Sequence, residues 1–480
     1  MGRPIRHTHT HAVGRLRALE GLRGLGHRRL DVLERRQHHE AAGHAGDRDG
    51  RQRRRPEDRA GPADRHCRRG LGHHHCVRGA QPCPAEPGAA GHPAQVHTTE
   101  DGDDPSMTDA TSMRIMFDHQ IFGAQKYGGI SRYFYELSNH LANCGHQDVE
   151  IFAPLYINEY FASDARVRPR GFKIPQLPRS RRITEAVNAM ATRLLVKPAR
   201  SIDIYHETYY SGTDNAPFSA KRILTVFDMI HERFRDGFMR NDQVYKAKAA
   251  AAHRADHIIC ISHKTQQDLI ELLDVDVAKT SVIHLGFALP QQGAVEQSVA
   301  PASRPYLLHV GLRAEYKNFE RVARAYAASP SLRKDYDLVC FGGGAFTSEE
   351  IELFRELAIA EPAVRHVAGD DLALAACYRA AAAFVYPSLY EGFGLPPLEA
   401  MSFDCPVVCS NVTSIPEVVG DAAELFDPYD VDAIRHAIER VTDNPARQAQ
   451  LIALGRARVQ LFSWEKCARE TLEAYSQSLS

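Results

Sequence analysis

The N-terminal part of this 480-residue chain lacks the residue types that build a folded core. Residues 1–100 contain no Lys, Phe, Tyr or Trp and a single Ile, whereas they hold 19 Arg and 13 of the 25 His. A segment with so few large apolar side chains cannot bury enough surface to offset the entropy lost on folding. We therefore expect residues 1–106 to be disordered, or to be a wrongly assigned stretch ahead of a true start at Met107 or Met113.

The chain also lacks long apolar runs and paired cysteines. The most apolar long window, residues 372–389, is interrupted by Arg379, and the N-terminus has no apolar segment, so we expect neither a membrane span nor a signal peptide. The ten cysteines show no paired C-x-x-C spacing. We therefore expect no metal site, and free thiols in a reducing compartment. These absences predict a cytoplasmic protein.

Charge is balanced overall but unevenly distributed, with 59 Lys and Arg against 60 Asp and Glu. In residues 1–100, 19 Arg stand against 11 acidic residues, so this part carries +8 and the rest of the chain carries −9. A basic tail can bind nucleic acid. Natural basic tails normally mix Lys with Arg, however, and this one has no Lys, so we expect no nucleic acid partner.

From Met113 onward, short β-rich runs alternate with helical patterns, which predicts an α/β protein with parallel sheets. The chain is also longer than one hydrophobic core usually serves. The polar segment 291–305 predicts a linker between two Rossmann-like domains, 107–295 and 300–463, with a final helix 464–480 joining the first domain. The predicted strands are 114–118, 149–153, 203–206, 223–227, 257–261, 281–285, 306–310, 337–341, 364–367, 383–386, 406–409 and 424–426.

A basic amphipathic segment, residues 178–200, interrupts this alternation. Its apolar residues recur at helical spacing, and six Arg and Lys residues flank them. Such a helix can lie on an anionic membrane surface. An ordinary surface helix that covers the sheet with its apolar side fits the pattern equally well, so both interpretations stay open.

The most specific pattern is SLYEGFGLPPLEAM, residues 388–401. Gly392 and Gly394 allow a tight loop after an apolar strand, and a Pro-Pro pair then opens a helix. The N–H groups at a helix N-terminus suit a diphosphate. Glu391 and Glu399 can face the same pocket, where carboxylates accept hydrogen bonds from sugar hydroxyls. Alternatively, Glu399 is a surface charge and the glycines form an ordinary turn.

This stretch closely resembles the donor-site motif of the retaining glycosyltransferase family 4, which has the GT-B fold. The resemblance spans residues 113–480, including TVFDMIHERF (225–234), LLHVGLRAEYKNF (307–319) and PVVCSNVTSIPEVVGDAAELFDP (406–428). It implies two Rossmann-like domains facing a central cleft. It also implies retaining transfer of a hexose from a nucleotide diphosphate sugar, with GDP-mannose as first choice. The acceptor would be a glycan or lipid-linked sugar in bacterial surface-polysaccharide synthesis.

The resemblance also implies roles for individual residues. Arg313 and Lys317 would bind the donor diphosphate, although many relatives place the Arg directly after the Gly, whereas here Leu312 intervenes. Glu399 would accept from the nucleotide ribose, and Glu391 would lie beside the transferred sugar. The remaining donor-binding residues implied in this way are Gly392, Phe393, Gly394, Leu395, Gly128 and Gly129.

Many relatives carry His-Asp where this chain has Phe227 and Asp228, and that His faces the reacting centre. Asp228, His231 and His206 are therefore candidates for its place. The family's chemistry is same-face attack without a protein nucleophile, so the resemblance implies neither a metal nor any other cofactor. Peripheral contact with the inner face of an anionic membrane fits the acceptor class.

Two other functions stay open at this point. A strand followed by Phe341 and three glycines would suit a Rossmann nucleotide-sugar epimerase or oxidoreductase, although the G-x-G-x-x-G spacing is absent. Phe227, in place of the usual His, would suit a degenerate scaffold that binds a nucleotide-sugar without turning it over.

Overall fold

The computed structural model describes most of the chain beyond residue 112, and these residues belong to one compact unit, 108–480. The expected extension, 1–106, lies outside the described residues, as does nearly all of the expected linker. The described ranges are 113–144, 148–161, 165–176, 181–199, 201–234, 243–287, 304–313 and 315–480.

The first sheet has seven parallel strands in the order β3-β2-β1-β4-β5-β6-β7. Most positions of its central strands are buried, because helices cover both faces, as parallel sheets require. The strands are β1 (Arg114–Phe117), β2 (Asp148–Tyr156), β3 (Pro169–Lys173), β4 (Ile204–Glu207), β5 (Lys221–Val226), β6 (His257–Cys260) and β7 (Thr280–Val282).

The second sheet repeats this topology with six parallel strands in the order β10-β9-β8-β11-β12-β13. In both sheets the strand order reverses beside the first strand, which is the doubly wound Rossmann arrangement. The strands are β8 (Tyr306–Val310), β9 (Asp337–Phe341), β10 (Val364–Val367), β11 (Ala383–Tyr386), β12 (Val407–Ser410) and β13 (Ala423–Phe426).

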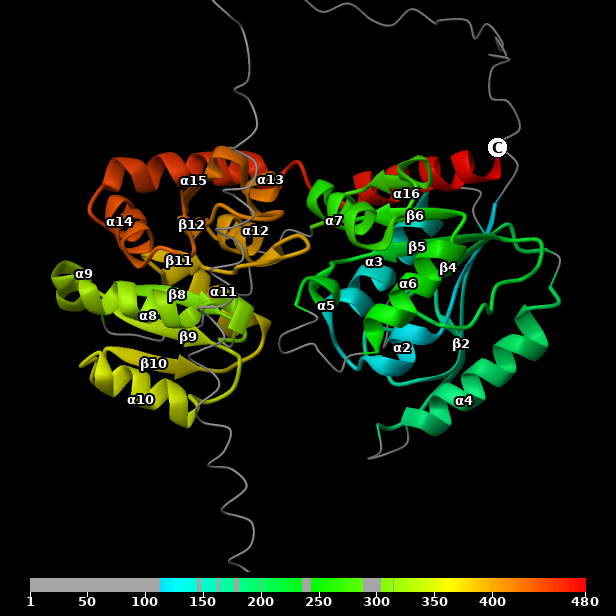
Figure 1. Cartoon of the computed structure of the whole chain (residues 1–480), viewed down its shortest axis with the longest axis horizontal. Coiled ribbons are helices and arrows are strands. Elements are labelled where there is room, and N and C mark those ends of the chain that lie inside the picture. The colour runs from blue at the N-terminus through cyan, green and yellow to red at the C-terminus, as the bar shows by residue number, and fades with distance from the viewer. Residues whose placement is uncertain are drawn as a thin grey trace, which may run out of the picture. The chain divides into compact units, whose positions relative to one another are not determined.

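Helices cover both faces of each sheet (Figure 1). Those of the first sheet are α2 (Gln120–Ala124), α3 (Gly129–Asn143), α4 (Arg181–Ala191), α5 (Ile230–Arg233), α6 (Val244–Arg254) and α7 (His263–Leu273). Those of the second sheet are α8 (Phe319–Ala328), α9 (Pro330–Asp335), α10 (Ser348–Glu356), α11 (Asp371–Ala380), α12 (Leu395–Ser402), α13 (Ile415–Val419), α14 (Val431–Thr442) and α15 (Pro445–Val459).

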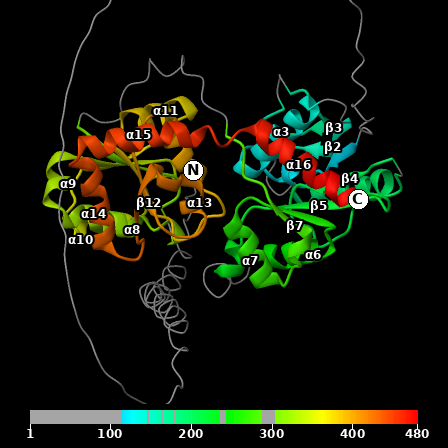
Figure 2. The same cartoon turned by 90° about the horizontal axis from the view of Figure 1, so that it is seen from above.

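The last helix, α16 (Trp464–Leu479), leaves the second sheet and packs on the first (Figure 2). It contacts α3, β5 and β6. The Trp464 ring occupies the space where a Cβ at Gly286 would stand, and the Tyr475 hydroxyl bonds to His206 of β4. The C-terminal helix therefore completes the core of the first sheet.

The predicted strands agree with the observed ones to within a few residues, and the parallel two-sheet architecture is confirmed. Strand β3 was not anticipated. Among the described residues, no helix is both long and apolar enough to cross a membrane. The seven cysteines of the described part are free thiols, and all but Cys144 are buried.

Candidate active site

Ligands of doubly wound sheets bind outside the carboxyl ends of the strands, where the strand order reverses. In the second sheet this point lies between β8 and β11, which are paired neighbours. The loop after β8 carries Arg313 and Lys317, and the loop after β11 carries Glu391. The topology therefore brings two of the motifs found in the sequence to one edge of the sheet.

Lys317 and Glu391 meet at this edge. The Lys317 Nζ donates to Glu391 Oε1 at 2.6 Å, and it lies over the Tyr316 ring, 5.1 Å from the ring centroid. Asn318 fixes the loop, because its side-chain amide donates to the carbonyls of Pro387 and Pro428 at 3.0 and 2.8 Å. Both charged side chains keep partial solvent access, at 22% for Lys317 and 14% for Glu391. A bound ligand can therefore reach the pair.

The glycines after Glu391 are required by close packing and by backbone conformation. A Cβ at Gly392 would lie 1.8 Å from the carbonyl oxygen of Phe227, so only glycine fits there. Gly394 has a φ of +108° and caps α12. The Ser414 hydroxyl lies 2.9 Å from the carbonyl oxygens of both Glu391 and Phe393. The loop is held rigidly against the loop that follows β5.

Glu399 lies in α12, which begins at Leu395. The Tyr378 hydroxyl donates to its carboxylate at 3.1 Å. Burial raises the pKa of Glu399, and the hydrogen bond from Tyr378 and the positive charge of Arg132 oppose that rise. Because Arg132 belongs to the first turn of α3, this turn lies near Glu399.

The glycine pair of the first sheet opens that same helix. Gly128 is the N-cap of α3 and contributes no side-chain cap, and a Cβ at Gly129 would meet no atom within 4 Å. Gln125 Oε1 accepts from the Ser131 backbone N–H of this first turn at 3.2 Å, while the first residue of α3, Gly129, is exposed. This is the arrangement of an anion-binding helix terminus, beside a carboxylate of the second sheet.

Phe227 turns inward, whereas Asp228 stays partly exposed. The Phe227 ring packs against Tyr133 and Phe134, with ring centroids 5.3 and 5.9 Å apart. The Asp228 side chain is 36% exposed. Burial raises the pKa of Tyr316, and the Glu391 and Asp228 carboxylates raise it further, so both acids lie near this one side chain. His231 is half-buried on α5, three residues further along.

Lys248 on α6 is a residue that sequence reasoning missed. Its side chain is fully buried, and its Nζ donates to the Asp228 carbonyl at 2.7 Å and to the Glu232 carboxylate at 2.8 Å. It thereby holds the loop that carries Asp228. Its spacing could have indicated that it faces the core, since Lys248 precedes the buried Ala251 and Ala252 by one helical turn.

Tyr390 joins the loops of the two sheets. Its hydroxyl accepts from the Met229 backbone N–H at 3.2 Å and donates to Asp268 at 2.8 Å. It precedes Glu391 directly, while Met229 follows Asp228. This hydrogen bond between their chain neighbours therefore holds the loops of Glu391 and Asp228 together.

Arg313 contacts a different loop from this pair, and its expected contact with the donor diphosphate stays a prediction. Its guanidinium donates to the carbonyls of Gly342 and Gly344 and to Glu350, at 2.8 to 2.9 Å. The side chain is 2% exposed. Arg313 therefore orders the glycine loop after β9.

His206 is a correction among the catalytic candidates. Its side chain is fully buried, and its two ring nitrogens bond to the hydroxyls of Tyr475 and Thr225 at 2.6 and 2.8 Å. Burial lowers the pKa of His206 to about 3. Both nitrogens are occupied inside the core, so His206 has a structural role.

This burial predicts that the protein loses stability on acidification. The pKa of His206 is about 3 and that of the buried His309 about 4, both lowered by burial below the ordinary 6.5. The unfolded chain binds more protons than the folded one below pH 6.5, so each histidine should cost about 2 kcal/mol at about pH 5. Melting temperatures at a series of pH values measure this. His206→Gln should flatten the dependence, and the exposed His436→Gln should not; equal slopes in both variants would contradict the assignment.

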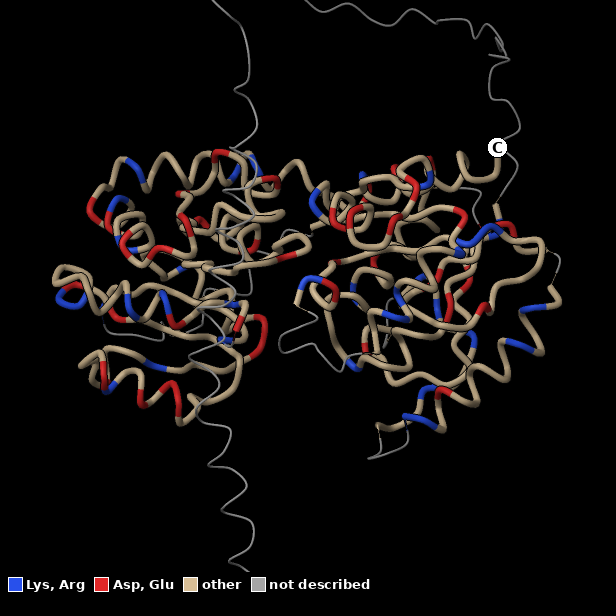
Figure 3. Tube along the Cα trace, in the orientation of Figure 1, with Lys and Arg blue, Asp and Glu red and all other residues tan. Residues whose placement is uncertain are grey.

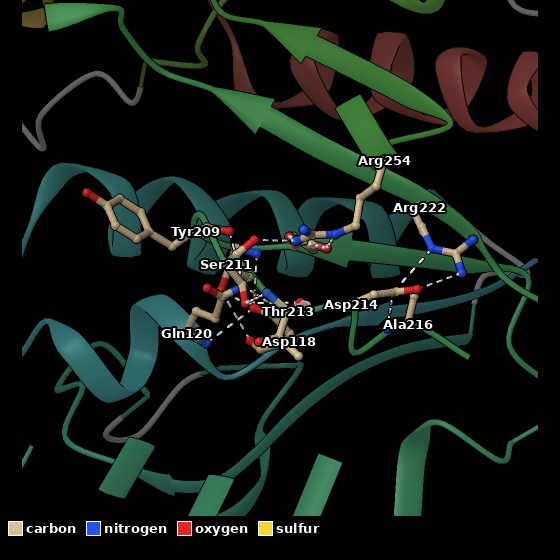
Figure 4. Close-up of polar contacts among 11 residues, drawn as sticks. Asp118, Gln120, Tyr209, Ser211, Thr213, Asp214, Ala216, Arg222 and Arg254 are labelled. Atoms are coloured by element: carbon tan, nitrogen blue, oxygen red, sulfur yellow. Dashed lines mark hydrogen bonds and ion pairs between the residues drawn. The ribbon is translucent and has the colours of Figure 1, made fainter. Parts of the chain in front are cut away.

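The corresponding point of the first sheet, between β1 and β4, is closed by protein contacts (Figure 4). Asp118 accepts from the Thr208 and Gln120 backbone N–H groups at 3.0 and 3.2 Å. Glu207 pairs with Arg254 through both carboxylate oxygens. Burial raises the pKa of Glu207, and Arg254 opposes the rise. Asp118 and Glu207 therefore hold the loop after β4 in place, and their carboxylates bind protein groups.

Two family models match the chain. The glycosyl transferases group 1 model matches residues 291–458, and the Glycosyltransferase Family 4 model matches residues 127–289. The chain is 32% identical over 369 residues to O-antigen chain mannosyltransferase B of Escherichia coli, covering 72% of this chain and 95% of that protein. The chain belongs to the family 4 glycosyltransferases. This membership leaves the epimerase and oxidoreductase interpretations without support, whereas the degenerate scaffold would belong to the same family.

Other relatives and solved structures agree with the family. This glycosyltransferase is 26% identical to the MMP alpha-(1->4)-mannosyltransferase of Mycolicibacterium hassiacum, covering 74% of this chain and 95% of that protein. Sucrose-phosphate synthase from Thermosynechococcus elongatus superposes with a TM-score of 0.59 at 23% identity, covering 76% and 98% of the two chains. Anabaena HepE in complex with UDP and glucose superposes with a TM-score of 0.57 at 17% identity, covering 76% of this chain and 99% of that chain. These structures confirm the GT-B fold.

Proposed function

We propose that this glycosyltransferase moves mannose from a nucleotide diphosphate donor, GDP-mannose first, to a glycan or lipid-linked acceptor of a bacterial surface polysaccharide. The Lys317–Glu391 pair at the carboxyl edge of the second sheet carries the proposal, because it joins a cation for phosphate to a carboxylate for sugar. The names of the two mannosyltransferase relatives support mannose.

Each charged group at the site has a distinct task in this proposal. On donor binding Lys317 exchanges part of its contact with Glu391 for the diphosphate, whose negative charge grows as it departs. Glu391 then orients the sugar beside the anomeric carbon. Glu399 accepts from the nucleotide ribose. The exposed first residue of α3, Gly129, would offer its backbone N–H to the phosphates, beside the Ser131 N–H that Gln125 already binds.

The reaction itself would occur on one face of the sugar. The acceptor hydroxyl oxygen bonds to the anomeric carbon while the bond from that carbon to the phosphate oxygen breaks, and the hydroxyl proton passes to the departing phosphate. The anomeric configuration is retained, and no protein nucleophile is required. Asp228 and His231 lie on the side of the first sheet and would orient the acceptor.

Stabilisation of the diphosphate by Lys317 also leads us to propose that transfer needs no metal ion. Among the residues that the structure describes, no group of His, Cys, Asp and Glu is arranged to hold one. Activity should therefore survive an excess of EDTA, and loss of transfer that added Mg²⁺ restores would overturn this point.

A donor panel tests the proposed function. GDP-mannose is expected to raise the melting temperature more than UDP-sugars, dTDP-sugars or NAD, because the donor that binds most tightly stabilises the protein most. A ligand at 100 times its Kd stabilises by about 2.7 kcal/mol. With an acceptor present, GDP should be released, and NMR of the glycoside should show the donor's anomeric configuration. Stabilisation by NAD alone, or a product of inverted configuration, would contradict the proposal.

A further inference from the structure

Helix α4 and the π-helical turn that follows it, Thr192–Val196, turn five large apolar side chains away from the protein, while Val196 at the end of the turn is buried. The exposed fractions are high for large apolar residues: 68% for Ile183, 43% for Val187, 59% for Met190, 64% for Leu194 and 63% for Leu195. Ile183, Val187, Met190 and Leu194 recur at helical spacing and form one stripe. We call these five residues the α4 stripe. It is an exposed patch of the kind that marks an interaction site.

The polar side of the same segment is the buried one. Thr184, Asn188 and Thr192 are each at most 5% exposed. The Asn188 amide accepts from the Leu155 N–H at 2.8 Å and donates to the Leu155 carbonyl at 2.9 Å, which fixes the helix at the end of β2. The Thr192 hydroxyl lies 3.3 Å from Nδ1 of His119, which is two residues beyond β1. Specific hydrogen bonds therefore hold the helix with its apolar side outward.

This orientation decides between the two interpretations of residues 178–200. An ordinary covering helix would bury its apolar side against the sheet, which the observed burial contradicts. Arg181 and Arg182 of α4 and Arg193 of the following turn are also exposed, and Figure 3 shows basic positions along this helix. The acidic Glu185 is paired with Arg181 at 2.7 Å. An apolar stripe flanked by unbalanced positive charge fits an anionic lipid surface.

We propose that the α4 stripe and its flanking arginines dock this glycosyltransferase onto an anionic membrane. Charge disfavours a second copy as the occupant, because a twofold contact would bring the arginines of both copies together. The docking surface rests on the proposed function only for the reason that docking is useful, namely access to a lipid-linked acceptor. Since α4 is attached at the carboxyl end of β1, docking would hold that edge of the first sheet near a lipid-linked acceptor.

Vesicle binding by the full chain tests the proposal. Vesicles that contain phosphatidylglycerol should bind it and pure phosphatidylcholine vesicles should not. Salt at about 1 M should weaken binding, because it shortens the Debye length, the distance over which charges interact, to about 3 Å. Met190→Ser combined with Leu194→Ser should lower partitioning at least about tenfold, since each substitution removes a large apolar side chain from the lipid contact. Arg182→Glu combined with Arg193→Glu should abolish the preference for anionic lipid.

The matched control is Ile351→Ser on α10, which removes an apolar side chain that is 48% exposed elsewhere. It should bind vesicles as the wild type does. Equal binding to neutral and anionic vesicles, or unchanged binding by both α4 variants, would overturn the proposal. A wild-type dimer that Met190→Ser and Leu194→Ser convert to a monomer would also overturn it, by identifying a second copy as the occupant.

Transferase activity separates this proposal from the proposed function. The α4 variants should turn over a water-soluble acceptor at the wild-type rate and lose rate only with an acceptor embedded in vesicles. If the wild type binds anionic vesicles through α4 but transfers no sugar, the docking surface stands and the proposed function fails. If the wild type transfers sugar but the α4 variants bind vesicles normally, the proposed function stands and the docking surface fails.

Discussion

Replacing Lys317 by Ala is expected to lower kcat about a hundredfold, with little effect on the fold. The Nζ of Lys317 stands at the edge between β8 and β11, where a departing diphosphate would gain negative charge. Removing one preorganised charge of this kind typically costs about 3 kcal/mol in the transition state. Steady-state kinetics at saturating acceptor measure the effect, with the exposed Lys334→Ala as the matched control.

Two glutamate variants sharpen this test. Glu391→Gln should also lower kcat, because its carboxylate would lie beside the anomeric carbon, where positive charge develops. Glu399→Gln should mainly raise KM, because a contact to the ribose is equally strong in the ground and transition states. Melting temperatures show whether any variant merely unfolds. Near-normal kcat in both Lys317→Ala and Glu391→Gln would show that the donor site lies elsewhere.

Replacing Lys248 by Met is expected to give the largest loss of stability, about 3 to 5 kcal/mol. The substitution removes the positive charge that compensates Glu232, whose side chain is 5% exposed, and it frees the Asp228 carbonyl. Breaking a buried ion pair from one side leaves an uncompensated charge in the core. Chemical denaturation measures the loss, and Lys246→Met, at an exposed position of the same helix, is the control.

A second variant keeps this prediction testable if the first does not fold. Lys248→Met combined with Glu232→Gln removes both charges and should recover much of the lost stability. Its kcat should remain reduced, because Asp228 would still lack the Nζ that holds its carbonyl. Full stability in Lys248→Met alone would contradict the compensating role of the buried lysine.

The architecture was predictable because parallel strands buried on both faces read as apolar runs in the sequence. Ala383–Tyr386 (AFVY), for example, is buried at each position. Strand β3 was missed because four of its five residues are exposed, which gives no apolar pattern. The family resemblance implied that Lys317 and Glu391 serve one donor site, but their direct contact was not predicted, because it depends on β8 and β11 being neighbours.

The direction of individual side chains was not predictable. Spacing places Arg313 near the diphosphate site, but its guanidinium turns to the carbonyls after β9. His206 lies at a strand end, yet the hydroxyls of Tyr475 and Thr225 hold it inside. Amphipathicity shows that α4 has two sides and not which one faces the sheet. Only the partners of Asn188 decide that.

Donor binding measured by calorimetry tests the central claim most directly, because it locates the site without depending on the acceptor. Wild-type protein should bind GDP-mannose, and Lys317→Ala and Glu399→Gln should each weaken binding about tenfold or more, as loss of a charged hydrogen bond does. Lys334→Ala should bind like the wild type. If both site variants bind the donor with unchanged affinity, the donor does not occupy the edge between β8 and β11, and the assignment of this site is wrong.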